Sequence, residues 1–157
     1  MPAWFKNSFL DFRDDVKEAT AANRRVMVYF GQNGCPYCKK LMEVNFGRKD
    51  ITDKTRKHFD AIELNILGSR EVTWLDGKTR SEKELAALLK VRYTPTLIFL
   101  DERGSIVLRL NGYHEPPGFL LALGYVADRA YLKEPDFARY ARARGGALEE
   151  RGSPIAN

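Results

Sequence analysis

Cysteine and histidine are scarce in this chain, which has only two of each among its 157 residues. Two cysteines cannot build the framework of several disulfides that holds small, loop-rich secreted domains together. A structural zinc site needs four ligands, and the spacing of His58 and His114 from the cysteines matches no zinc finger. The scarcity argues against a disulfide-rich scaffold, and the spacing argues against a structural zinc site.

Long hydrophobic runs are also missing. No apolar stretch approaches the roughly 20 residues that a helix needs to span a bilayer. The first residues, Met1–Lys6, lack the charged and then apolar segments of a signal peptide. We therefore expect either a cytosolic protein or the mature form of an exported one.

Acidic residues do not balance the basic ones, because 26 Lys and Arg against 21 Asp and Glu give a formal net charge of +5. No basic stripe interleaved with aromatic residues accompanies this charge, so we expect a solvated surface and no nucleic-acid partner. The length and a hydrophobic content of 44% suit one globular domain. Gly, Ala, Glu, Ser and Pro dominate from residue 145, which predicts a domain over 1–144 and a disordered tail over 145–157.

The two cysteines lie together in the segment Cys35-Pro36-Tyr37-Cys38. A disulfide across so short a loop constrains the unfolded chain little, so a purely structural bridge explains it poorly. Pro36 suits the first turn of a helix, which would place Cys35 at a helix N-terminus, where free N–H groups and the helix dipole favour a thiolate. The pattern therefore indicates a redox-active pair, in which Cys35 attacks and the less exposed Cys38 resolves.

Hydrophobic periodicity and capping residues predict the order of the elements. Helices are expected over 8–23 with Ser8 as N-cap, from the cysteine motif to Gly47, over 50–58, over 81–91, from Pro117 and from Pro135. Strands are expected over 26–30, 61–66, 96–100 and 105–110, with a small hairpin within 68–80. In the first helix, Phe9, Phe12, Val16 and Ala19 should face the core. The connections imply a parallel strand pair that an antiparallel hairpin extends.

This order resembles the thioredoxin fold over about residues 8–130. The similarity is carried by Cys35-Pro36-Tyr37-Cys38, by Thr94-Pro95-Thr96 before the third long strand, and by Gly104 and Gly112 beside the last strand. It implies an α/β protein with a central mixed sheet flanked by helices. It also implies that Pro95 is cis and presents the Thr94 backbone to an extended peptide, with Pro36 and Tyr37 on the same substrate-binding rim.

Longer phrases resemble a narrower group, the exported bacterial thioredoxins of sulfur-oxidation systems (SoxW-like). These phrases are Gly34–Lys40, Glu43–Phe46, Leu64–Ile66 and Gly68–Val72. The resemblance implies a monomeric periplasmic reductase that acts on disulfide-bearing proteins and contributes to cell redox homeostasis. An upstream donor, such as a membrane thiol transporter, would supply its electrons, and its only redox group would be the Cys35–Cys38 disulfide.

Two positions depart from the family's pattern. Thioredoxins carry a buried Asp where this chain has Tyr29, and a Lys where it has Glu63. We expect Tyr29 to lie in the core. Glu63 is a candidate acceptor for the Cys38 proton if it is buried near that sulfur, and a solvated carboxylate at the edge of the sheet is the alternative.

Other activities stay open from the sequence. The Pro-Tyr pair between the cysteines also occurs in glutaredoxins, so a glutathione-dependent oxidoreductase is an alternative. A thiol-based metal carrier is an alternative of a different class. The direction of electron flow depends on the reduction potential, which the motif does not specify.

Overall fold

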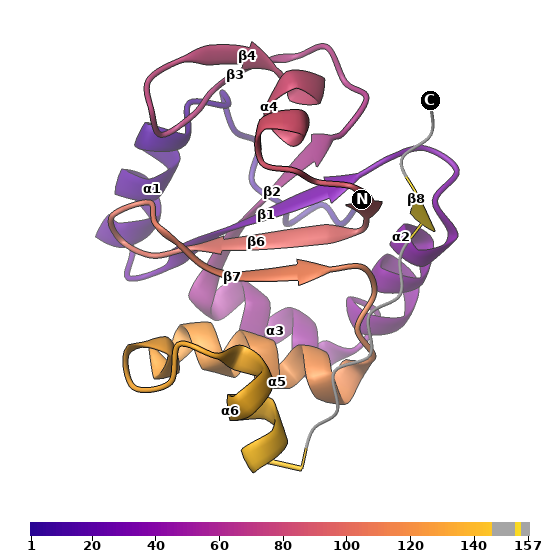
Figure 1. The fold of residues 1–157 in the computed structure, drawn as a ribbon, viewed down its shortest axis with the longest axis vertical. Helices are drawn as coiled ribbons and strands as arrows, with labels where there is room; N and C mark the ends of the chain where they lie inside the picture. Colours follow the sequence, from indigo (N-terminus) through magenta and orange to yellow (C-terminus); the bar gives the residue numbers. More distant parts are fainter. Residues whose placement is uncertain (146–152, 155–157) are drawn as a thin grey trace.

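The computed structural model describes residues 1–145 and 153–154, and Figure 1 shows a sheet between two layers of helices. The helices are α1 (Phe12–Ala21), α2 (Pro36–Lys40), α3 (Lys49–His58), α4 (Glu82–Leu88), α5 (Pro116–Ala127) and α6 (Phe137–Ala143). A π-helical turn, η1 (Leu41–Asn45), continues α2, and a 3-10 turn, η2 (Ala130–Leu132), follows α5. The strands are β1 (Arg25–Gly31), β2 (Phe59–Asn65), β3 (Glu71–Thr73), β4 (Thr79–Ser81), β5 (Tyr93–Thr94), β6 (Thr96–Leu100), β7 (Ile106–Asn111) and β8 (Ser153–Pro154).

The main sheet has the strand order β2-β1-β6-β7. β1 pairs with β2 in parallel, whereas β6 pairs antiparallel with both β1 and β7, which confirms the predicted mixed sheet. Every residue of β1 is buried, as its unbroken apolar run requires of a central strand. The predicted hairpin within 68–80 is formed by β3 and β4.

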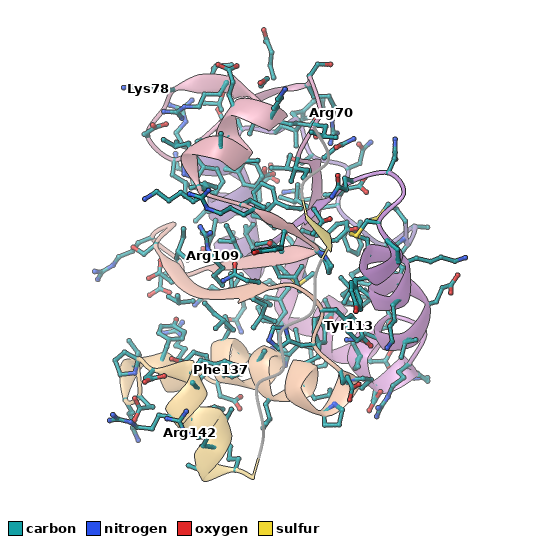
Figure 2. All side chains as sticks on the ribbon, turned by 45° about the vertical axis from the view of Figure 1, so that its right-hand side comes forward. Arg70, Lys78, Arg109, Tyr113, Phe137 and Arg142 are labelled. Carbon is teal, nitrogen blue, oxygen red and sulfur yellow. A yellow bond between two sulfur atoms is a disulfide. The ribbon has the colours of Figure 1, made fainter. Side chains whose placement is uncertain are left out.

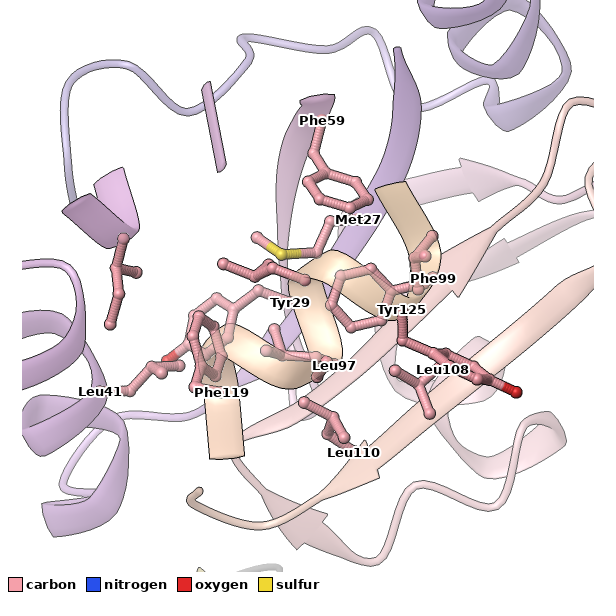
Figure 3. Close-up of a cluster of buried hydrophobic side chains, with 14 of the residues drawn as sticks. Met27, Tyr29, Leu41, Phe59, Leu97, Phe99, Leu108, Leu110, Phe119 and Tyr125 are labelled. Atoms are coloured by element: carbon pink, nitrogen blue, oxygen red, sulfur yellow. The ribbon is translucent and has the colours of Figure 1, made fainter. Parts of the chain in front are cut away.

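The two faces of the sheet carry separate cores because successive side chains of a strand point to opposite faces. Val28 and Phe30 face α1 and α4 together with the β3–β4 hairpin. Met27 and Tyr29 face the other side, where Phe119 and Tyr125 of α5 complete the cluster in Figure 3. Arg70, Lys78 and Arg142 lie at the periphery, as Figure 2 shows.

The start of the first helix differs from the prediction. α1 begins at Phe12, and its N-cap is Asp11, whose carboxylate accepts the Arg13 N–H. Ser8 lies outside the helix, where its hydroxyl donates to Asp15 Oδ2 at 2.7 Å. Phe9 is therefore fully exposed, and the expectation that it faces the core was wrong, whereas Phe12, Val16 and Ala19 are buried.

Other boundaries follow their capping residues. Ser81 caps α4 and forms a capping box with Glu84, as the sequence pattern predicts, although α4 ends at Leu88 and not near Val91. At the C-terminus, residues 153–154 form β8, which pairs with β5. This pairing departs from the predicted disordered tail. The remainder of that prediction, beyond residue 145, lies outside the described residues.

The N-terminal segment, for which no role was predicted, packs on the core. Trp4 and Phe5 both make edge contacts with Phe46, with ring centroids 5.4 and 6.0 Å apart. The Lys6 N–H donates to the Ala61 carbonyl of β2 at 2.7 Å. The first six residues therefore lie along the β2 edge, next to the end of the sheet where the cysteines lie.

Candidate active site

The cysteine pair lies where β1 gives way to α2. Cys35 is the N-cap of α2 and Pro36 occupies the first turn, as predicted. The two cysteines form a disulfide, and the Cys38 N–H donates to Cys35 Sγ at 3.1 Å. Their exposed fractions are 7% for Cys35 and 6% for Cys38. The expected difference in exposure between the two cysteines is therefore absent from this oxidised form.

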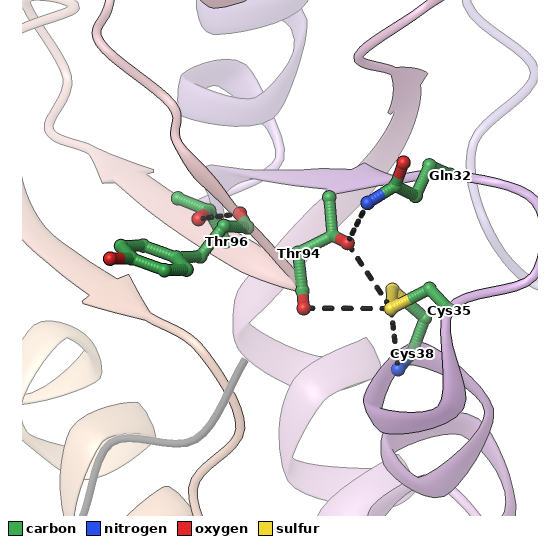
Figure 4. Close-up of a disulfide and its surroundings, with 6 residues drawn as sticks. Gln32, Cys35, Cys38, Thr94 and Thr96 are labelled. Carbon is green, nitrogen blue, oxygen red and sulfur yellow. Dashed lines mark hydrogen bonds between the residues drawn. A yellow bond between two sulfur atoms is a disulfide. The ribbon is translucent and has the colours of Figure 1, made fainter. Parts of the chain in front are cut away.

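The strand end at Thr94–Pro95 faces this disulfide, and its peptide bond is cis. Thr94 is fully buried, and its carbonyl oxygen lies 3.5 Å from Cys35 Sγ. Its hydroxyl donates to the same sulfur at 3.2 Å. Gln32, in the loop after β1, donates its side-chain amide to Thr94 Oγ1 at 2.8 Å, and Figure 4 shows these contacts together. The structure thus joins the cysteine loop to the proline loop through Thr94.

A cavity of about 530 Å³ opens beside the disulfide and is lined by both cysteines, Tyr29, Glu63 and Met42, among others. Tyr29 is buried, as expected, and a Cβ at Gly31 would collide with its ring. Burial is the main cause that raises the pKa of Tyr29, and the charge of Glu63 raises it further. Tyr29 therefore stays a neutral phenol at physiological pH.

Glu63 lies opposite Tyr29 in the parallel register of β1 and β2. It is half-buried and borders the cavity that also reaches Cys38, so its place falls between the two alternatives from the sequence. Tyr29 and Glu63 thus stand where thioredoxins carry Asp and Lys, and Glu63 is the carboxylate that lines this cavity.

The outer rim of the site is aromatic and basic. Pro36 is exposed, and the half-buried Tyr37 stacks on Tyr113 with ring centroids 6.2 Å apart. Lys40 Nζ lies 4.9 Å from the centre of the Tyr113 ring. Sequence reasoning did not single out Tyr113, because nothing local links it to the cysteine motif.

Behind this rim, hydrogen bonds connect η1 to the loop after β7. The Tyr113 hydroxyl donates to Asn45 Oδ1 at 2.7 Å, and Asn45 Nδ2 donates to the His114 carbonyl at 2.9 Å. His114 is buried. Within residues 1–145, no three or more Cys, His, Asp or Glu side chains gather as metal ligands.

A disulfide at the start of a helix, facing the strand end before a cis-proline, defines a thiol–disulfide oxidoreductase in general terms. The chain belongs to the thioredoxin-like family, because a family model described as a thioredoxin-like domain matches residues 12–127. The α/β thioredoxin-like fold expected from the sequence is thereby confirmed.

Solved structures agree with this assignment. A thioredoxin-fold protein from Helicobacter pylori is 27% identical with a TM-score of 0.69, and the match covers 77% of this chain and 81% of that one. A thioredoxin from Thermus thermophilus is 25% identical with a TM-score of 0.61, over 79% of this chain and 90% of that one. A putative disulphide-isomerase from Bacteroides thetaiotaomicron, 24% identical, has the same fold with a TM-score of 0.60, over 77% and 91% of the two chains. No curated protein matches the chain.

No helix in the described part of the chain is both long enough and apolar enough to cross a membrane.

Proposed function

We propose that this protein reduces disulfides in other proteins through a cycle between the Cys35–Cys38 dithiol and disulfide. The observation that carries the proposal is the position of Cys35, which caps α2 and lies within 3.5 Å of both polar oxygens of Thr94. A helix N-terminus and a hydroxyl donor both favour negative charge on sulfur. The ionised thiol is the attacking species in disulfide exchange.

The reduction takes two displacement steps. The Cys35 thiolate attacks one sulfur of the substrate disulfide, so a mixed disulfide forms and the first substrate thiolate leaves and takes a proton. Cys38, after losing its proton, attacks Cys35 Sγ, which forms the Cys35–Cys38 bond and releases the second substrate thiolate. Two electrons pass from the enzyme dithiol to the substrate, and an external dithiol donor must return them.

Extended peptides are the substrate shape that this site favours. The short strand β5 ends at Thr94, beside the disulfide, and a substrate segment could pair with its backbone. Pro36 and Tyr37 would contact the substrate from the helix side, and Pro95 from the strand side. β8 pairs with β5 in the structure, so a substrate that used this edge would replace β8 there.

Trapping with Cys38→Ser tests the mechanism. Without the resolving thiol, the mixed disulfide on Cys35 should accumulate with a disulfide-bearing protein such as insulin, and non-reducing gels with mass spectrometry would detect the adduct. Cys35→Ser in the same background is the control and should give none. If the Cys38→Ser protein forms no adduct, the proposed order of attack is wrong.

Two further measurements separate the reductase from its alternatives. A reduction potential near that of thioredoxin, about −270 mV, would support a reductase, whereas a value near −120 mV would indicate an oxidant. A turnover that requires glutathione would favour the glutaredoxin-like alternative.

We also propose, from the resemblance to exported thioredoxins of sulfur-oxidation systems, that the protein works in the periplasm and receives electrons from a membrane thiol transporter. The redox state of the cysteines in cells tests this, because loss of such a transporter should leave the pair oxidised. A pair that stays reduced without the transporter would point to a cytosolic donor.

A further inference from the structure

Gln32 reaches Thr94 from a segment 62 residues away in the sequence, and the contact leads directly to the attacking sulfur. Gln32 Nε2 lies 2.8 Å from Thr94 Oγ1, which lies 3.2 Å from Cys35 Sγ. Thr94 has no exposed surface, so bulk water does not compete for its hydroxyl. Gln32 itself is only partly buried and belongs to neither cysteine motif nor proline loop.

The chemistry of these groups fixes the direction of the hydrogen bonds. The amide nitrogen of Gln32 can only donate, so Thr94 Oγ1 must accept from it. A hydroxyl has one hydrogen of its own, and the hydrogen of Thr94 is then left for the sulfur of Cys35. If the amide were reversed, its oxygen would face Oγ1 and would draw that hydrogen away from the sulfur.

The direction of the hydroxyl hydrogen bond matters because Thr94 presents both an acceptor, its carbonyl, and a donor, its hydroxyl, to the sulfur of Cys35. Its carbonyl oxygen, 3.5 Å from Sγ, favours a protonated thiol, to which it can serve as acceptor. Its hydroxyl favours the thiolate, because a hydrogen bond to a charged acceptor is about twice as strong as one between neutral groups. The orientation of the hydroxyl therefore decides whether Thr94 as a whole supports the ionised form.

We propose that Gln32 is a positioning residue that orients the Thr94 hydroxyl toward Cys35 and so stabilises the attacking thiolate. The inference builds on the proposed function, since it concerns the nucleophile of that reaction. The hydroxyl joins the Cys38 N–H, 3.1 Å from Cys35 Sγ, as a second donor to the sulfur. These donors stabilise the thiolate of the reduced form more than the neutral disulfide. Gln32 therefore raises the reduction potential of the cysteine pair, which makes the wild-type protein a weaker reductant than a variant that lacks Gln32.

The test is the pH at which Cys35 becomes half ionised, measured by the rate of iodoacetamide alkylation in the Cys38→Ser protein. Gln32→Leu keeps the size of the side chain and removes the donor, so the midpoint should rise by about one pH unit. Alkylation at a fixed pH below the midpoint should then slow about tenfold. Gln32→Glu presents only acceptors and a negative charge, and it should raise the midpoint further.

Two comparisons test whether the change in the Cys35 ionisation midpoint arises because Gln32 positions the Thr94 hydroxyl. In a Thr94→Val background, Gln32→Leu should cause no further change, because the hydroxyl that it orients is gone. Asn33→Leu, next to Gln32, should leave the midpoint where it is. The titratable groups that share the cavity with the sulfur are the Met1 amine and the side chains of Tyr29, Lys39 and Glu63, and they are the same in all variants.

An unchanged midpoint in folded Gln32→Leu protein, or equal shifts with and without the Thr94 hydroxyl, would overturn the inference. Circular dichroism identifies variants that fail to fold, and the Gln32→Glu variant then repeats the test. Alkylation needs no protein substrate, so this outcome is independent of the trapping experiment. If the ionisation midpoint of Cys35 rises as expected in Gln32→Leu but the trapping experiment gives no mixed disulfide, the proposed function is refuted and the role of Gln32 stands.

Discussion

Tyr29 and Glu63 lie opposite each other on neighbouring strands and share the cavity beside the disulfide. Burial and the nearby carboxylate keep the pKa of Tyr29 high, so its phenol can donate a hydrogen bond but cannot take up a proton. A base for Cys38 must therefore be a different group. Glu63 is the one carboxylate among the residues that line the cavity in the described chain.

We expect Glu63→Gln to slow the resolving step and spare the first attack. Positioned proton transfer contributes about 10²-fold or more to a rate, so release of the mixed disulfide by Cys38 should slow about a hundredfold. Stopped-flow measurements that separate formation from release of the mixed disulfide would show this difference. Glu43→Gln, at an exposed position of η1, is the matched control. Equal slowing of both steps in Glu63→Gln would exclude Glu63 as the base.

At the scale of elements, Glu82, the first residue of α4, connects this helix to the end of β2 and to the loop that follows β2. Its side chain is 2% exposed and pairs with Arg70, with Glu82 Oε2 3.0 Å from Arg70 Nη2. It also accepts the backbone N–H of Asn65 at 2.7 Å and of Arg70 at 3.1 Å. A Cβ at Gly68 would collide with this carboxylate, so the loop after β2 is built around it. Burial opposes the charge of Glu82, but these hydrogen bonds outweigh it and lower its pKa.

Glu82→Gln should reduce the free energy of unfolding at pH 7 by about 2 kcal/mol, the typical value of hydrogen bonds to a charged group. Because the pKa of Glu82 is lower in the folded state, its stabilisation is complete above its ordinary value of 4.5. It is lost as the pH falls through the folded-state pKa. Urea unfolding at pH 7 and at acid pH should therefore show a difference between wild type and variant that shrinks below pH 4.5. Glu71→Gln, at an exposed position of β3, should show no such difference.

Elements whose signal is local could be predicted from the sequence. The run Leu97–Leu100 is apolar and follows the β-branched Thr96, and Thr96–Leu100 forms β6 with the predicted bounds. Ser81 has Glu84 three residues on, and the two form the expected capping box. At the first helix the sequence predicted Ser8 as the N-cap, whereas the structure has Asp11. The helix starts later than predicted, at Phe12, and Asp11 forms a β-bridge with Thr73 of β3. A contact between residues so far apart in the sequence cannot be predicted from the local pattern.

The residues of the candidate site also differ in whether a local sequence signal marks them. The cysteines and Pro95 are marked by short motifs, so their place could be predicted. Gln32 could not be, because its meeting with Thr94 depends on how β1 and β5 pack and not on any local spacing. The burial of His114 also depends on tertiary packing, since Asn45 of η1 donates a hydrogen bond to its carbonyl from another part of the chain.

At the scale of the whole molecule, the fold rests on two cores rather than on the disulfide. The central strand β1 contributes to both, with Val28 on one face of the sheet and Met27 on the other. The disulfide closes a loop of a few residues at the edge of one core, and loop-closure entropy gives such a bridge about 2 kcal/mol. Small domains have net stabilities of about 5–15 kcal/mol, so loss of the bridge should leave the protein folded.

The double variant Cys35→Ser/Cys38→Ser tests this separation of folding from chemistry. It should unfold cooperatively, with a far-ultraviolet circular dichroism spectrum like that of wild type and a free energy of unfolding lower by about 2 kcal/mol or less. It should reduce no protein disulfide. Reduced wild type is the control, because it lacks the bridge but keeps both sulfurs, and it should resemble the variant in stability. If the variant and the reduced protein were both unfolded, the disulfide would be a structural bridge, and a cycle that opens it at each turnover could not operate.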